Sequence, residues 1–164
     1  MASVATPAAT GHRAAPVATT IGVLLFLGFT ALGGGVALTL DGGAAPPGDW
    51  LDQVPLIDSW TIPGLVLGIG FGLGSLVVGY GMWRKRTWRR LRPVERLTRH
   101  HWSWLGALLI GAGHLVWISL ELIYLPELSI LQAVYGAVGL ALVLLPLLPS
   151  ARSHLRSASV QPPG

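Results

Sequence analysis

The sequence predicts an all-α fold, a four-helix transmembrane bundle with both termini in the cytoplasm. Four apolar runs are each long enough to cross a bilayer, whose hydrocarbon core takes about 20 helical residues. Charged residues make up only 11% of the chain, whereas soluble domains carry about 25%. The basic residues lie between the second and third apolar runs and near the two ends of the chain.

Composition also excludes several classes of function. The 164 residues suffice for one compact bundle and do not require a second domain. The chain has no cysteine, which removes disulfides, iron–sulfur clusters and thiolate metal sites. Its isoelectric point of 10.4 is in the range of nucleic-acid-binding proteins. Because the positive charge lies beside apolar runs, we expect anionic lipid headgroups as partners and no nucleic acid.

The first half of the chain begins with residues 1–16, which are rich in alanine, threonine and proline and predict a disordered cytoplasmic tail. Residues 17–40 form an uncharged apolar run and predict the first helix. A cleaved signal peptide with Ala44 and Ala45 at the processing site is the alternative, although the run is long for one. Residues 41–61 carry four aspartates, no basic residue and two tryptophans, which indicate an interfacial loop outside the membrane.

Residues 62–83 predict the second helix, in which Gly64, Gly68 and Gly72 stand four positions apart. In lipid no hydrophobic force drives helices together, so small residues at this spacing mark surfaces where backbones approach closely. We therefore expect these three glycines to form a helix-contact surface, within the bundle or between copies of the chain.

Residues 84–99 orient the whole chain. They hold eight of the eleven Lys/Arg residues and one acid, Glu95, and such loops stay on the cytoplasmic side of the plasma membrane. A short interfacial helix, broken or started at Pro93, is expected here. Six basic side chains of this segment are expected to contact lipid headgroups: Arg84, Lys85, Arg86, Arg89, Arg90 and Arg92.

Residues 102–125 and 128–148 predict the third and fourth helices, joined by a turn so short that they form an antiparallel hairpin. Pro146 and Pro149 are expected to end the fourth helix. Residues 149–164 are expected to be a second disordered cytoplasmic tail. With this topology all eleven basic residues lie inside, and six of the seven acids lie at or near the outer side.

Few polar side chains fall within the predicted spans. His114, Trp117 and Glu121 are spaced so that they share one face of the third helix. Ionisable residues inside a membrane are candidates for proton or ligand handling. Structural roles stay open for both ionisable groups, with His114 donating to a backbone carbonyl and Glu121 reaching water at the headgroups.

Glu121 lies five residues before Pro126, and Gln132 lies six residues after it, so the hairpin places both at nearly the same depth. A carboxylate there is unfavourable unless it is hydrogen-bonded. We expect Glu121 to point into the bundle and to bond Gln132, Tyr135 or a tryptophan indole. Among other elements, Trp60 offers the nearest indole.

The remaining inventory predicts no catalytic residue, metal or cofactor. A haem held between two helices needs a second histidine at matching depth, and no other predicted helix has one. Ser75 and His114 differ by about 6 Å in depth, which argues against a serine–histidine protease pair. No two intramembrane ligands have the spacing of a hydrolase zinc site.

Several motifs match a known pattern of small membrane proteins. They are Ile62-Pro63-Gly64 after an acidic loop, the arginine-rich residues 84–92, Trp117 with Glu121, and Leu131-Gln132 with Tyr135. With these features the chain resembles an uncharacterised family of small four-helix integral membrane proteins, found mainly in high-GC Gram-positive bacteria. The resemblance covers roughly residues 55–147 and implies the architecture, but no activity.

We therefore expect a non-catalytic membrane protein, a structural or accessory subunit that packs against itself or a larger complex. The alternative is a small transporter or proton-coupled flux protein that uses Glu121 and His114. An enzyme is the least favoured class. Close glycine-mediated packing would favour the first interpretation, whereas a water-filled path to Glu121 would favour the second.

Overall fold

The structure, a computed structural model, describes residues 15–40, 58–125, 127 and 129–156. Within these ranges the chain is helical and contains no strand. Four helices are long and apolar enough to cross a membrane, and the predicted all-α bundle is confirmed. Their bounds differ from the predicted ranges by at most two residues at either end: Ala15–Thr39, Thr61–Arg84, Trp102–Tyr124 and Ile130–Leu147.

The second of these helices differs from the regular α-helix that the sequence predicts. It consists of α2 (Thr61–Leu65), a π-helix η2 (Val66–Leu73) and α3 (Gly74–Arg84). Glycine occupies three of the eight η2 positions, and glycine is among the weakest helix formers. The glycines that suit close packing therefore also weaken the regular α pattern, and the departure falls where they are densest.

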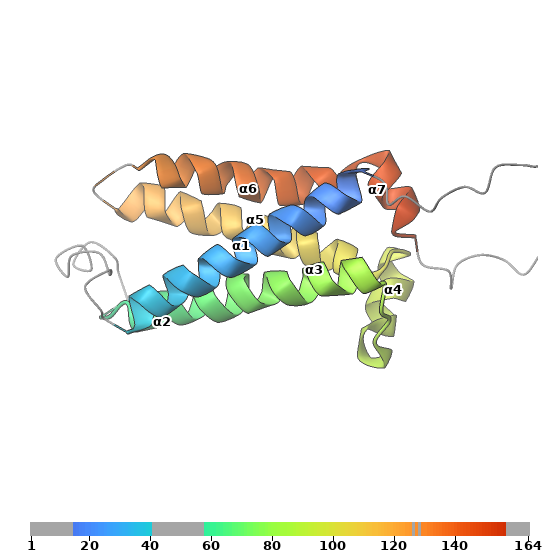
Figure 1. Ribbon diagram of the computed structural model, residues 1–164, viewed down its shortest axis with the longest axis horizontal. Helices are drawn as coiled ribbons and strands as arrows, with labels where there is room; N and C mark the ends of the chain where they lie inside the picture. Colours follow the sequence, from blue (N-terminus) through green and yellow to red (C-terminus); the bar gives the residue numbers. More distant parts are fainter. Residues whose placement is uncertain (1–14, 41–57, 126, 128, 157–164) are drawn as a thin grey trace, which may run out of the picture.

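The remaining long helices are α1 (Ala15–Thr39), α5 (Trp102–Tyr124) and α6 (Ile130–Leu147). Figure 1 shows α5 and α6 side by side as an antiparallel hairpin, with α1 crossing the bundle diagonally. Helix α1 packs along α2, η2 and α3, and it also contacts α6, while α3 contacts α5. In Figure 1 the start of α2 and the end of α5 lie far apart, whereas α3 and the start of α5 converge. We call the diverging end the distal end.

Helix α1 meets α2 and η2 through glycines. A Cβ atom on Gly35 would lie 2.5 Å from the Cα atom of Gly68 and 2.6 Å from the carbonyl oxygen of Gly64. Gly72 faces Leu32 of α1 in the same way, and Gly64, Gly68 and Gly72 are all buried. The glycines singled out by their spacing thus lie at a contact within the chain, where two backbones touch.

The opposite end of the bundle, which we call the basic end, carries two short helices after α3: η3 (Arg89–Leu91) and α4 (Arg92–Thr98). Helix α3 stops at Lys85 and α4 stops at Arg99, and both residues have positive φ angles. Pro93 lies in the first turn of α4, so it starts this helix.

The prediction of a disordered tail from residue 149 is wrong for its first part, because α7 (Pro149–His154) is a helix at the basic end. The side chains of Ala151 and Leu155 are 0% and 2% exposed. The backbone N–H of His101 donates to the carbonyl of Leu155 over 2.8 Å. Two apolar residues one turn apart therefore hold this segment on the bundle. Pro146, expected to end the fourth helix, lies buried inside α6, which runs on to Leu147.

Candidate functional site

His114 lies in the middle of α5 and is the most deeply buried histidine described, with its side chain 2% exposed. Aromatic rings surround it. The ring of Phe71 in η2 meets the imidazole edge-on at 5.1 Å between centroids, and the ring of Tyr135 in α6 does so at 5.8 Å. Phe71 also contacts Trp117, one turn further along α5, at 6.1 Å. His114, Trp117 and Tyr135, three of the candidates from the sequence, are thus close together.

Neither ring nitrogen of His114 has a hydrogen-bond partner among the described residues. The hydroxyl oxygen of Ser75, one turn after Phe71 on α3, is also buried without a partner, and the residue is 0% exposed. A buried polar group without a hydrogen bond is unfavourable by about 1–3 kcal/mol. The expected alternative, in which His114 donates to a backbone carbonyl, is therefore not what the structure has.

Glu121 is partly buried near the distal end of α5, and its Oε1 atom accepts a hydrogen bond from the indole N–H of Trp117. An indole was one of the expected donors, but this one comes from the same helix. The indole nitrogen of Trp60, expected as the nearest donor from another element, is buried without a partner among the described residues. Glu121 and Trp117 therefore form a pair four residues apart on one helix face.

Gln132, another of the partners expected for Glu121, bonds elsewhere. The side-chain oxygen of Gln132 accepts from the backbone N–H of Ser129, and the Ser129 hydroxyl caps the start of α6 in return. Ser129 and Gln132 therefore form a capping box, which satisfies backbone donors that no helical partner can reach. The sequence contains this S-x-x-Q signal immediately before an apolar run, and depth-matching alone overlooked it.

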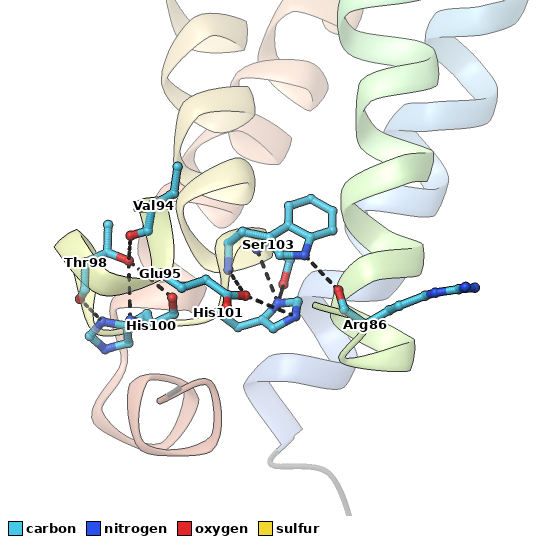
Figure 2. A network of polar contacts seen from close by, with 8 residues as sticks. Arg86, Val94, Glu95, Thr98, His100, His101 and Ser103 are labelled. Carbon is cyan, nitrogen blue, oxygen red and sulfur yellow. Dashed lines mark hydrogen bonds and ion pairs between the residues drawn. The ribbon is translucent and has the colours of Figure 1, made fainter. Parts of the chain in front are cut away.

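A second polar cluster lies at the basic end, where α4 and the start of α5 meet (Figure 2). The Nε2 atom of His101 is 3.7 Å from Oε1 of Glu95, and the same oxygen accepts from the backbone N–H of Trp102 over 3.4 Å. On its other side, Nδ1 of His101 is 2.8 Å from the Ser103 hydroxyl. His101 also caps α5, because this nitrogen accepts from the backbone N–H of Ser103.

These contacts place a serine, a histidine and a glutamate in a row, as in a hydrolase. The Ser103 side chain is 0% exposed, however, and Glu95 and His101 are 5% and 7% exposed. A nucleophile needs access to its substrate, and every member of this row is covered. The arrangement therefore acts as a helix cap and a clamp between α4 and α5.

The clamp leaves His101 neutral near pH 7. Burial lowers the pKa of His101 below its ordinary value, and the nearby Glu95 carboxylate opposes this shift without cancelling it. A neutral imidazole can accept at Nδ1, which the cap of α5 requires. Of these residues only Glu95 was considered from the sequence, as the one acid among the basic residues 84–99. The position of His101 immediately before the apolar run that begins at Trp102 was the signal that could have indicated a helix cap.

The basic side chains themselves face outward. All ten described Lys and Arg residues are exposed, including the six expected to contact lipid headgroups. Glu95, the one described acid at this end, is buried against His101. The outer surface of the basic end is therefore positively charged throughout the described part.

The described residues contain no group of three or more His, Asp or Glu side chains placed to hold a metal ion. The chain matches no protein-family model, no curated protein and no solved structure. The resemblance to small four-helix membrane proteins therefore stays a prediction. The class of the chain follows from its helices alone: four are long and apolar enough to cross a membrane, which indicates a multi-pass membrane protein.

Proposed function

We propose that this chain is a non-catalytic membrane protein that serves as a structural or accessory subunit. Its bundle is packed as a rigid body and does not enclose a transport path. The observation that carries this proposal is the backbone contact of Gly35 with Gly64 and Gly68. Such contacts maximise van der Waals packing between helices in lipid, and they leave no space between α1 and α2 for a solute.

The basic end supports a second part of the proposal, the orientation and the lipid partner. Ten exposed basic side chains with no exposed acid among the described residues of that end suit the anionic inner leaflet of a plasma membrane. Each contributes about 1 kcal/mol near such a surface. Both termini then lie in the cytoplasm, and the anionic lipid also fixes the depth of the bundle. A homo-oligomer or a larger membrane complex is the expected assembly.

A flux assay tests the structural role against transport. The purified chain is reconstituted into vesicles that enclose a pH-sensitive dye, and a proton or potassium gradient is imposed. The structural role predicts dye traces that match protein-free vesicles at every protein density. A rate that rises with protein density and falls in the Glu121→Gln variant would overturn the proposal in favour of a flux protein.

Lipid binding is tested by exchange between nanodiscs of neutral and anionic composition at two salt concentrations. We expect the chain to prefer anionic discs and to lose this preference when salt is raised, because exposed charges are screened. The Arg89→Gln, Arg90→Gln double variant should show a weaker preference, whereas Asp58→Asn should not. Equal partition of the unmodified chain at low salt would contradict the lipid partner.

A further inference from the structure

The core between α3 and α5 holds two polar side chains that the described residues do not satisfy. His114 and Ser75 are 2% and 0% exposed, and neither has a hydrogen-bond partner among the described residues. A neutral imidazole offers one donor and one acceptor, and a hydroxyl offers both as well. Two such side chains buried without partners make the fold less stable unless a guest pairs with them.

The register of the two helices brings these groups into reach of one guest. Phe71 contacts His114, and a Cβ atom on Gly74 would lie 3.8 Å from Ile110. Ser75 therefore lies level with residue 110 or 111. This is about one helical turn, or 5.4 Å, closer to the basic end than His114. A water that makes two hydrogen bonds of about 2.8 Å at its near-tetrahedral angle spans about 4.6 Å, so the offset suits a short chain of about two waters.

The position of the remaining polar groups gives this guest a direction of entry. On the distal side of His114, the same face of α5 carries the hydrogen-bonded pair Trp117 and Glu121. At that end the start of α2 and the end of α5 also lie far apart (Figure 1). On the other side of Ser75 lies a layer of buried apolar side chains: Leu24, Val78, Met82, Trp102 and Leu142. This layer separates Ser75 from the buried polar cluster of Glu95, His101 and Ser103 at the basic end.

We propose that His114 and Ser75 form an internal water-binding site that is reached only from the distal end, past Trp117 and Glu121. The proposal goes beyond the structural role and is compatible with it, because water that passes Glu121 but ends at Ser75 does not form the continuous path that transport needs. A chain of water that ends at Ser75 does not cross the bundle, so the site exchanges water and protons with one side of the membrane alone.

Cysteine accessibility tests the site, and the chain is well suited because it has no cysteine of its own. Ser75→Cys is nearly isosteric. Val78→Cys, one turn further on α3 and 7% exposed, is the matched buried control. Ser59→Cys and Ser153→Cys, both exposed, report the distal and the basic side respectively. Each variant is reconstituted into vesicles and treated from one side at a time with Ag⁺, a thiol-reactive cation that does not cross the bilayer and is small enough to follow water.

We expect Ser75→Cys to react at least about tenfold faster than Val78→Cys, because apolar surroundings suppress the reactive thiolate. It should react only from the side on which Ser59→Cys reacts. If Ser75→Cys is as inert as Val78→Cys, or if it reacts from the side of Ser153→Cys, the proposal is wrong. His114→Cys provides an independent second position with the same expectation.

Discussion

The helix Thr61–Arg84 has two buried faces that are built in different ways. Toward α1 it presents Gly64, Gly68 and Gly72. The two backbones meet directly at Gly35, and the side chains of Thr39 and Leu32 fill the space beside Gly64 and Gly72. Toward α5 it presents Phe71 and Val78, and helical spacing puts the buried Ser75 on the same face. On that face side chains separate the helices, and polar atoms are buried without partners.

The difference shows that the two faces of one membrane helix can serve different purposes. Glycines at four-residue spacing have no function other than to let another backbone approach. A buried hydroxyl and imidazole contribute nothing to packing that an apolar side chain would not contribute better. The first face therefore accounts for the stability of the bundle, and the second is where a guest can bind. Four substitutions or titrations test this division.

The largest effect is expected on the glycine face. Gly35→Ala places a methyl group against backbone atoms of Gly64 and Gly68 that cannot move without displacing a helix. Overpacking of this kind makes a fold less stable by about 1–3 kcal/mol or more. The matched control is Gly68→Ala, whose Cβ atom would lie at an ordinary 3.5 Å from Gly35. Thermal unfolding in detergent should separate the two variants, and equal melting temperatures would refute the proposed asymmetry.

A smaller loss is expected at the distal part of the α5 face. Trp117→Phe keeps an aromatic ring beside Phe71 but removes the N–H that Glu121 accepts from. An intramolecular hydrogen bond contributes about 0.5–1.5 kcal/mol to stability. A double-mutant cycle with Glu121→Gln measures the coupling between the two positions in the same unfolding assay. Additive effects would show that the bond contributes nothing to stability.

Replacement by leucine should affect stability differently at two buried histidines, His114 and His101. Replacement of His114 by leucine removes a polar group that no described residue satisfies, so we expect stability to be unchanged or to rise by up to about 1 kcal/mol. His101→Leu removes the cap of α5 and the partner of Glu95, so it should lower stability by about 1–2 kcal/mol. Equal losses in the two variants would mean that His114 has a partner in the protein.

The smallest effect is a pH dependence at the basic end. Because the pKa of His101 is lower in the folded chain than its ordinary value of 6.5, the unfolded chain binds more protons at mildly acidic pH. The contribution of His101 to stability is therefore fully present above pH 6.5 and is lost as the pH falls below it. His101→Asn keeps a capping oxygen but does not titrate. Its melting temperature should fall less than that of the unmodified chain between pH 7.5 and about 5.5, and parallel curves would exclude His101 as the source.

The sequence was sufficient for the parts of the fold that depend on hydropathy alone. The four long helices follow from apolar runs, and the face that carries His114, Trp117 and Glu121 follows from helical spacing. The helix α7 was not predicted, because Ala151 and Leu155 are only two apolar positions in a short polar segment. Their partners on the bundle are remote in sequence.

The candidate site was only half predictable, for a physical reason. Spacing places Glu121 and Gln132 at one depth, but it does not say which hydrogen bonds compete for each side chain. Local bonds prevailed in both cases: Glu121 bonds Trp117 one turn away, and Gln132 bonds Ser129 in a capping box. Local bonds are favoured because they fix fewer rotatable groups than bonds between helices. A comparison of depths alone does not take this entropy difference into account.

The central claim is that water, rather than the protein, satisfies the imidazole of His114. Water-edited solid-state NMR on histidine-labelled protein in liposomes tests it without any substitution, because magnetisation passes first to side chains in contact with water. We predict that the ring signals of His114 build up from water as early as those of a solvent-exposed histidine, and that they vanish in the His114→Leu variant. Build-up only after transfer through neighbouring protein protons would show a dry imidazole and contradict the account.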